Sequence, residues 1–424
     1  MARKRVLVIA PHSSYRTPAF IDAANRMGID VLFASEGKNS VVSAYSDGLH
    51  IDLEDTSGAL RAIHKEATRH PFSGIIGTDD LTTELAALAA QQLDLPHNPL
   101  QAVQVARRKD LARAVLSEKG IPVPDHRCID LRQPIAPQAE GVRFPCVLKP
   151  LALSASRGVI RADNPDQFAR ACARIDLLLK NEGAKESDII LAEDFIPGFE
   201  VAVEGMLSRG KLSILAVFDK PDPLDGPYFE ETYYVTPSRL GRQALSEIQQ
   251  RIDEGCAAYG LREGPVHAEC RVNDAGVWLL EIAARTIGGL CARLLSFGTG
   301  QSLEELVLAH AMGYPMMSAR EDSGGVGVLM IPVPAAGILR RVEGLLAAER
   351  TPFIEEVTIL VRSGYQLVPW PEGSSYLGFI FARAPTPEQA ETALRQSHAC
   401  LNFVVAPVWN LNPASESRIA ESGL

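Results

Sequence analysis

The feature that most constrains the fold is the alternation of strand and helix signals in the first hundred residues. Apolar runs at 6–10 and 31–35 have the length of buried strands, and the segment 17–28 between them has helical character and ends in glycine. A third apolar run, at 74–77, precedes another helical pattern. Alternating units of this kind predict a doubly wound parallel sheet, so residues 1–105 are expected to form an α/β, Rossmann-like domain.

The carboxyl ends of these strands are the expected ligand-binding edge of such a sheet. They lead into the loops Pro11–Tyr15 and Thr78–Asp80. Asp79 and Asp80 either cap the next helix or contact a substrate, and the two roles are compatible. No G-x-G-x-x-G motif follows the first strand, which argues against a dinucleotide-dependent oxidoreductase.

The chain has 424 residues, which exceeds the size of one hydrophobic core, so two or three subdomains are expected. After the first domain, short strands and an amphipathic helix predict a small α+β lid, and the remainder predicts a larger α+β domain. The last residues are polar and rich in serine. The expected boundaries are 106–205 for a helix pair and the lid, 206–410 for the C-terminal domain with a subdomain at about 320–405, and 411–424 for a loose tail.

Composition and charge exclude several classes of protein. Hydrophobic residues make up 46% of the chain and charged residues 22%, the balance of a soluble globular protein. The net charge of −10, with acids and bases interspersed, argues against binding to nucleic acid or to a membrane surface. The seven scattered cysteines include no C-x-x-C pair, and the first apolar run is too short for a signal peptide. A reduced cytoplasm is therefore the expected location.

Two lysines and a small-residue loop suggest a phosphate site. Lys149 stands on an otherwise apolar strand, where burial of its charge requires a negative partner such as phosphate oxygens; a solvent-facing edge lysine is the alternative. Lys109 lies in a basic run that by itself would indicate solvated surface. The loop after Lys149 contains Ser156, Arg157 and Gly158, and small residues let backbone N–H groups approach an anion. This loop is not a P-loop, because the chain lacks G-x-x-x-x-G-K-[ST].

A second pattern, at 192–205, is a strand, a proline–glycine turn and another strand. It places Glu193 and Glu200 seven residues apart. Such a hinge can offer backbone groups to an adenine edge and a carboxylate to ribose hydroxyls. The alternative is a plain hairpin that carries acidic residues.

The strongest chemical signal is a hairpin predicted around Ala275. His267, Glu269 and Arg271 alternate on one face of its first strand. With the turn centred on Ala275, Glu269 and Glu281 lie opposite each other, where like charges destabilise the pairing. A divalent cation removes that penalty, and carboxylates beside phosphate oxygens favour Mg²⁺. The alternative is that both acids face water.

Arg285 and a glycine pair follow this hairpin. The planar guanidinium of Arg285, four residues beyond Glu281, could clamp a carboxylate or a transferring phosphoryl group. Gly288 and Gly289 allow close approach of the backbone to a substrate.

The order of these features resembles the ATP-grasp superfamily, and the resemblance extends from the first strand to about residue 405. Within it, the stretches 228–240, 267–295 and 376–398 resemble the bacterial L-amino-acid ligases, which make dipeptides from unprotected amino acids. Many ATP-grasp enzymes carry asparagine two residues after the second metal-binding glutamate. This chain has Ala283 there, a departure that resembles the amino-acid ligase branch.

The resemblance implies a role for each candidate residue. Contacts to ATP phosphates are implied for Lys109, Lys149, Ser156, Arg157 and Gly158, and further nucleotide contacts for Glu193, Asp194, Phe195, Ile196, Glu200 and His267. Glu269 and Glu281 would ligate Mg²⁺ (or Mn²⁺), and Arg285 and Lys149 would take part in catalysis. Substrate contacts are implied for Asp80, Glu230, Glu231, Tyr233, Arg285, Gly288 and Gly289.

The implied reaction joins a carboxylic acid to an amine. The acid would take the γ-phosphoryl group of ATP to form an acyl phosphate, and an amine would then displace phosphate. Small-molecule acid and amine partners are expected, and family habit suggests a homodimer. Four alternatives stay open: an ATP-grasp kinase, a biotin-dependent type of carboxylase (although no biotinylation segment is present), a glycinamide ribonucleotide synthetase-like ligase, and a non-catalytic ATP sensor.

Overall fold

The computed structural model describes residues 5–12, 14–36, 48–183, 188–315, 324–373 and 375–408. The proposed tail at 411–424 and Ser13 of the first candidate loop lie outside the described residues. No helix within these ranges is both long enough and apolar enough to cross a membrane.

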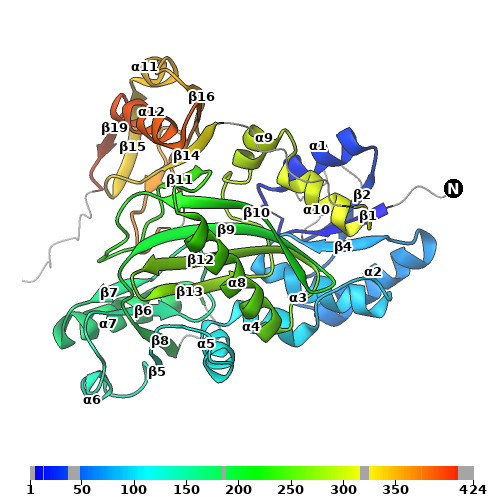
Figure 1. The fold of residues 1–424 in the computed structure, drawn as a ribbon, viewed down its shortest axis with the longest axis horizontal. Helices are drawn as coiled ribbons and strands as arrows, with labels where there is room; N and C mark the ends of the chain where they lie inside the picture. Colours follow the sequence, from blue (N-terminus) through cyan, green and yellow to red (C-terminus); the bar gives the residue numbers. More distant parts are fainter. Residues whose placement is uncertain are drawn as a thin grey trace, which may run out of the picture.

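The N-terminal part is a parallel four-stranded sheet with helices on its faces, as the sequence pattern predicted (Figure 1). Its strand order is β3-β2-β1-β4, and β1 is almost completely buried. Helix α1 has proline in its first turn and ends at Gly28 in the left-handed conformation. The elements are β1 (Arg5–Ile9), α1 (Thr17–Met27), β2 (Asp30–Ser35), β3 (Gly48–His50), α2 (Thr56–Arg69), β4 (Gly74–Gly77) and α3 (Asp80–Gln92).

The centre of the molecule is an eight-stranded antiparallel sheet of order β13-β12-β9-β10-β11-β14-β18-β16. Its strands come from the whole second half of the chain, so the C-terminal segment extends this sheet rather than standing apart. The strands are β9 (Phe199–Ser208), β10 (Lys211–Lys220), β11 (Tyr233–Thr236), β12 (Gly264–Asn273), β13 (Gly276–Ala283), β14 (Gly325–Ile331), β16 (Ile354–Ile359) and β18 (Gly378–Ala384).

The lid is a separate four-stranded sheet of order β5-β8-β6-β7, covered by helix α7. Strand β9, which the sequence analysis assigned to the lid segment, pairs with β10 and β12 of the large sheet instead. The lid elements are β5 (His126–Asp130), α6 (Ile135–Ala139), β6 (Cys146–Pro150), β7 (Ile160–Ala162), α7 (Pro165–Asn181) and β8 (Ile189–Asp194).

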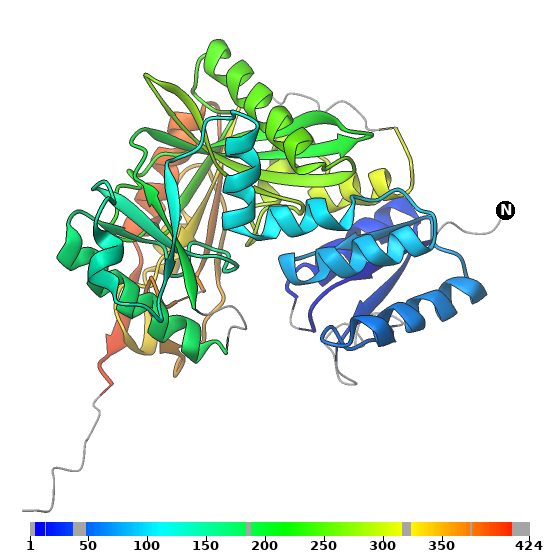
Figure 2. The ribbon, with the colours of Figure 1, turned by 90° about the horizontal axis from the view of Figure 1, so that it is seen from below.

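The helix pair expected before the lid is α4 (Leu100–Arg107) and α5 (Lys109–Glu118). Both helices pack with α8 (Arg242–Tyr259) on β9, β12 and β13, in one hydrophobic core. Figure 2 shows this pair running between the N-terminal domain and the lid. The pair thus belongs to the large sheet, and it delivers Lys109 to the space between the two flanking parts.

The remaining elements complete the two ends of the large sheet. Helix α10 packs against α1, so one hydrophobic core joins the N-terminal sheet to the large sheet. Helix α12 covers β14 and β18, beside a small sheet of order β17-β15-β19. These elements are α9 (Arg293–Thr299), α10 (Leu303–Ala311), β15 (Gly337–Glu343), α11 (Leu345–Glu349), β17 (Gln366–Leu367), α12 (Pro387–Ala399) and β19 (Asn402–Ala406).

Candidate active site

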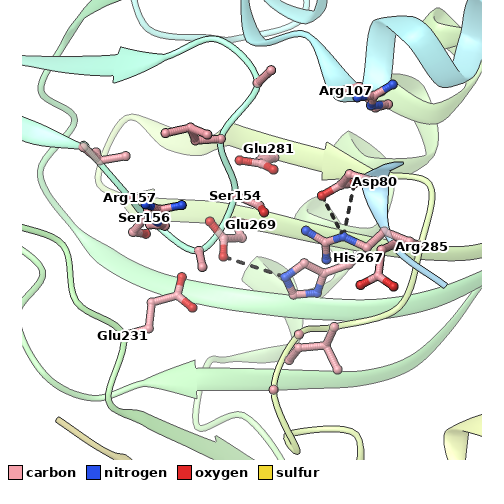
Figure 3. A pocket seen from close by; sticks show the side chains of 18 of the residues that line it. Asp80, Arg107, Ser154, Ser156, Arg157, Glu231, His267, Glu269, Glu281 and Arg285 are labelled. Carbon is pink, nitrogen blue, oxygen red and sulfur yellow. Dashed lines mark hydrogen bonds and ion pairs between the residues drawn. The ribbon is translucent and has the colours of Figure 1, made fainter. Parts of the chain in front are cut away.

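A cavity of about 1980 Å³ lies where the N-terminal domain, the lid and the large sheet meet. Figure 3 shows Asp80, Glu231, His267, Glu269, Glu281 and Arg285 around it, with Ser154, Ser156 and Arg157 on the lid loop. The sequence-predicted residues that line it are Asp80, Lys109, Lys149, Ser156, Arg157, Glu193, Asp194, Phe195, Ile196, Glu200, His267, Glu269, Glu281, Arg285, Gly288 and Gly289.

Both predicted phosphate lysines face this cavity. The Nζ of Lys149 lies 2.6 Å from Glu193, whose other oxygen accepts a hydrogen bond from Arg113 Nε at 2.6 Å. Burial by itself raises the pKa of the Glu193 carboxyl, but Arg113 and Lys149 outweigh it and lower that pKa to about 2. Glu193 is therefore an ion-pair partner that holds Lys149 in position.

The second lysine, Lys109, donates from Nζ to the Leu153 carbonyl at 2.8 Å and lies 3.6 Å from a Glu281 oxygen. It therefore connects the lid loop to one of the predicted metal-binding glutamates. In that loop Ala155 and Ser156 both have positive φ, 57° and 53°. Non-glycine residues adopt this conformation at a cost of about 1–2 kcal/mol each, and such strain is concentrated at functional loops.

The hinge between the lid and the large sheet consists of Asp194, Phe195 and Ile196. The ring of Phe195 lies 6.5 Å from that of Phe229 and beneath the guanidinium of Arg271, which also donates to the Ile196 carbonyl at 2.8 Å. These contacts form a flat, partly apolar wall that suits an aromatic base.

The hairpin β12–β13 pairs Glu269 with Glu281, as predicted, although its turn is not centred on Ala275. Asn273 pairs with Gly276, and this register alone would place Glu269 opposite Leu280. A bulge after Glu269 adds one residue to β13 and restores the pairing. Two carboxylates on adjacent strands, both in the cavity wall, supply the hard oxygen ligands that Mg²⁺ prefers.

A cluster of three carboxylates surrounds Lys220, a residue that the sequence analysis did not single out. Its Nζ lies 2.7 Å from Glu231, 2.9 Å from Glu200 and 2.9 Å from Glu269. One oxygen from each of these glutamates lies within 4.8 Å of the others, so the group could hold a metal ion. Burial lowers the pKa of Lys220, but the three carboxylates raise it well above its ordinary value, so the ammonium stays charged and offsets part of their negative charge. Glu200 also binds Arg271 at 2.8 Å, so both of its carboxylate oxygens have cationic partners.

His267 connects two glutamates on the same face of the sheet. Its Nδ1 lies 2.6 Å from Glu204, and its Nε2 lies 3.7 Å from Glu269. Burial lowers the pKa of this imidazole, but the hydrogen bonds and negative charges of Glu204 and Glu269 together outweigh burial and raise the pKa to about 9. The imidazole therefore favours its cationic form, next to a candidate metal ligand.

Arg285 and Asp80 form an ion pair across the domain boundary, with Nε 3.1 Å from the carboxylate. Burial would raise the pKa of Asp80, yet Arg285 lowers it below its ordinary value. The carboxylate of Asp80 is thus already paired with a cation of the protein itself. Asp79 caps helix α3. We infer that Asp80 orients the guanidinium of Arg285.

Three sequence-predicted residues do not line the cavity. Glu230 and Tyr233 are not part of the cavity wall, and Tyr233 lies under Arg395 in the core with α12. Glu231, which the sequence analysis named with them, does line the cavity, together with Tyr234. Gly158 lies in the lid loop but outside the cavity wall, and its N–H donates to the Pro371 carbonyl at 3.1 Å.

The residues that the sequence analysis missed include Lys220, Tyr234 and Arg16. Lys220 ends an apolar strand, and this is the same signal that singled out Lys149. Tyr234 donates to Glu231 at 2.5 Å. Arg16 follows the first candidate loop and carried no local signal, because its importance depends on a contact with Thr286, 270 residues away.

Comparison with known proteins agrees with this geometry. Three family models match the chain: an ATP-grasp N-terminal domain over residues 21–97, an ATP-grasp domain over 142–293, and an L-amino acid ligase C-terminal domain 2 over 329–406. The ATP-grasp domain model spans the lid and part of the large sheet, and the C-terminal model covers strands that complete that sheet.

Curated relatives and a solved structure are similar over most of the chain. Alanine–anticapsin ligase of Bacillus subtilis is 25% identical over 338 residues, which cover 68% of this chain and 70% of that protein. Dapdiamide A synthase of Enterobacter agglomerans is 24% identical over 271 residues, 62% of each. The crystal structure of the L-amino acid ligase from Bacillus licheniformis has the same fold, with a TM-score of 0.80 and 24% identity over 96% of this chain and all of that one. The chain belongs to the ATP-grasp superfamily, and within it to the carboxylate–amine ligases.

Proposed function

We propose that this protein forms an amide between two small substrates, at least one of them an amino acid, through an acyl phosphate made at the expense of ATP. The observation that carries the proposal is the convergence of Lys109, Lys149, Glu269, Glu281 and Arg285 on one cavity. The cations suit a triphosphate, the paired carboxylates suit a divalent metal, and Arg285 suits a carboxylate. The similarity to amino-acid ligases supports the choice of substrate class.

The nucleotide would lie between the lid and the large sheet. Phe195 and Ile196 would contact the adenine, and Glu200 would accept hydrogen bonds from the ribose. Lys149, held by Glu193, and Lys109 would bind the phosphates, with the Ser154–Arg157 loop above them. Because the two ammonium groups have fixed partners, they would stabilise charge on the transferring phosphoryl group without rearrangement.

The carboxylates fit a resident Mg²⁺. Glu269 and Glu281 would be its first ligands, and Glu231 is close enough to join Glu269 in holding a second ion. Glu231 would thus replace the asparagine that many ATP-grasp enzymes carry where this chain has Ala283. A bound divalent ion supplies electrostatic neutralisation of the phosphate oxygens during transfer.

The chain's own groups would govern the remaining steps. Arg285, oriented by Asp80, would hold the substrate carboxylate and stabilise the negative charge of the acyl phosphate and of the tetrahedral species. The lid is already in contact with the C-terminal segment: Arg174 binds Glu372 through both carboxylate oxygens, and the N–H of Gly158 binds Pro371. Closure of this kind would keep water from the acyl phosphate until the amine attacks.

The test is phosphate release from ATP and Mg²⁺, screened over pairs of amino acids and other small acids and amines, with products identified by mass spectrometry. We expect release that requires both partners and yields ADP and an amide. Release with glycine and a phosphoribosylamine, and with no amino-acid pair, would assign a glycinamide ribonucleotide synthetase-like ligase instead. ATP binding without turnover with any pair would leave a sensor and contradict the proposal.

A further inference from the structure

The cavity contains a second arginine, Arg16, that the mechanism above does not use. It lies at the start of α1, after the carboxyl end of β1, and only 6% of it is exposed. It lines the cavity together with Tyr15, Asp79, Arg285 and Gly288. This end of the cavity is therefore built by the N-terminal domain on one side and by the segment after β13 on the other.

The charge of Arg16 is buried with a single, loose ion-pair partner among the described residues. Its Nη groups donate to the hydroxyl and the carbonyl of Thr286, both uncharged acceptors. Its Nε has no hydrogen-bond partner, and the nearest carboxylate oxygen, on Asp79, lies 3.8 Å away. Asp79 is committed elsewhere, since it caps α3 and accepts from Thr78 at 2.5 Å. A buried guanidinium with a free N–H costs folding free energy unless a ligand supplies the anion.

Arg16 and Arg285 converge on the same atom. Arg285 Nη1 donates to the Thr286 carbonyl at 3.0 Å, and Arg16 Nη2 lies 3.4 Å from that oxygen. Arg285 has Asp80 as its counter-ion, whereas Arg16 has only the distant Asp79. Two guanidinium groups this close repel each other, and an additional anion between them would lower the energy of the site.

We propose that Arg16 binds the free carboxylate of the amine substrate, which makes that substrate an α-amino acid. The inference rests on the proposed function and extends it to the second substrate. In an α-amino acid two bonds separate the nitrogen from the carboxyl carbon. When the nitrogen attacks an acyl group held at Arg285, its own carboxylate therefore lies beside that group, where Arg16 is. The guanidinium of Arg16 lines the cavity, and its Nη groups donate only to uncharged oxygens, so it would take the carboxylate in a charge-assisted pair.

The experiment compares each L-amino acid with its own carboxamide as the amine substrate, in wild-type protein and in Arg16→Met and Arg16→Lys. The wild type should have a KM for the acid at least tenfold below that for the amide. Arg16→Met should raise the KM for the acid by about 10- to 100-fold, the worth of a charge-assisted hydrogen bond, with the amide KM and both kcat values little changed. Arg16→Lys keeps the charge but loses the paired N–H donors of the guanidinium, so its KM for the acid should lie between those of the wild type and Arg16→Met.

Arg26→Met is the matched control, because Arg26 lies on the same helix, is exposed, and pairs with Glu305 away from the cavity. It should leave every KM unchanged. Equal losses for acid and amide in Arg16→Met would show a structural role and overturn the proposal. A fall in acyl phosphate formation in the absence of any amine would instead place Arg16 at the acid substrate, and would also overturn it.

Calorimetry separates this proposal from the proposed function. The same acids and amides are titrated into protein saturated with Mg²⁺ and ADP. Preference of the wild type for the acids, lost in Arg16→Met, supports the carboxylate site even where no pair of substrates turns over. Equal binding of acid and amide by the wild type overturns it, whatever the outcome of the phosphate-release assay.

Discussion

At the scale of single residues, most cations of the site are paired with carboxylates. Lys149 is paired with Glu193, Arg285 with Asp80, and Lys220 with three glutamates. Such pairs cost desolvation energy and contribute little net stability, but they fix the position of the charge. The arrangement is expected where positively charged groups must be in place before a triphosphate arrives.

Glu193 gives the clearest dependence on pH. Its pKa is about 2 in the folded protein against an ordinary 4.5, so its contribution to stability is complete above pH 4.5 and is lost as the pH falls toward 2. The difference corresponds to about 3 kcal/mol. We expect Glu193→Gln to lower the free energy of unfolding at pH 7 by about 3–5 kcal/mol, and to flatten its fall below pH 4.5.

Urea unfolding at a series of pH values measures this effect. Glu254→Gln, which breaks a partly exposed ion pair with Arg251 on α8, is the control and should leave the fall in unfolding free energy below pH 4.5 unchanged. If the free energy of unfolding of Glu193→Gln falls below pH 4.5 as steeply as that of the wild type, the assignment of Glu193 as a buried ionised partner is contradicted.

Glu281 is the residue-scale test of the metal site. Glu281→Gln keeps the shape of the side chain and removes the charge that a divalent ion requires, so turnover of ATP should fall by more than 100-fold while the fold persists. Steady-state ADP formation across a Mg²⁺ titration measures it, with circular dichroism as the check on folding. Glu254→Gln on helix α8 is the control. Unchanged turnover would show that Glu281 is not a ligand.

At the scale of elements, small irregularities set the geometry of the site. The bulge in the hairpin β12–β13 brings Glu269 opposite Glu281, which a regular two-residue turn would not do. The lid loop depends on a similar irregularity, because Gly158 has a φ of 68° and packs against Pro150 and Leu178. A Cβ there would lie 2.8 Å from Pro150 Cγ and 3.0 Å from Leu178 Cδ2.

We therefore expect Gly158→Ala to displace the loop and raise the KM for ATP by about 5- to 30-fold, the equivalent of 1–2 kcal/mol. Initial rates over an ATP titration measure this effect. Gly210→Ala is a matched control, since Gly210 also has a positive φ but has open space around its Cβ and lies far from the cavity. A KM that rises equally in both variants would indicate general destabilisation instead.

At the scale of the whole molecule, the hydrophobic cores are unequally connected. One core joins the N-terminal sheet to the large sheet through α9 and α10, whereas the lid has a core of its own. The lid is attached through hydrogen bonds, the exposed ion pair Arg174–Glu372, the buried ion pair Arg113–Glu193 and a small apolar cluster of Val147 with Leu224 and Phe229. This cluster is much smaller than the core that joins the N-terminal sheet to the large sheet, so the lid is the part most able to move as a unit.

Hydrogen exchange followed by mass spectrometry tests this difference. Amides of the lid strands β6 and β8 should exchange faster than those of β9 and β12 in the protein alone, and should slow when Mg²⁺ and ADP are added. In Lys149→Met the nucleotide should give less protection. Equal exchange in the lid and the large sheet before nucleotide addition would argue against an independent lid.

Much of the fold and of the site could be predicted from local patterns. The parallel sheet followed from alternating apolar runs and helices, and the hairpin that carries Glu269 and Glu281 followed from alternation around a turn, although the bulge that brings the two opposite each other did not. These features depend on residues close in sequence, where side-chain periodicity is decisive. The order of lysines, small-residue loop and glutamates then indicated the ATP-grasp superfamily.

What local patterns could not decide were the contacts between distant segments. The face presented by residues 230–234 depends on how β11 enters the large sheet, and Lys220 matters only because β9, β12 and the segment with Glu231 meet around it. The pairing of Asp80 with Arg285 and the contact of Arg16 with Thr286 both span more than 200 residues. The sequence by itself thus determined which elements form and which chemical groups they carry. The tertiary structure alone decided which charges neutralise one another and which stay available to a substrate, because that depends on distances between segments that no local periodicity encodes.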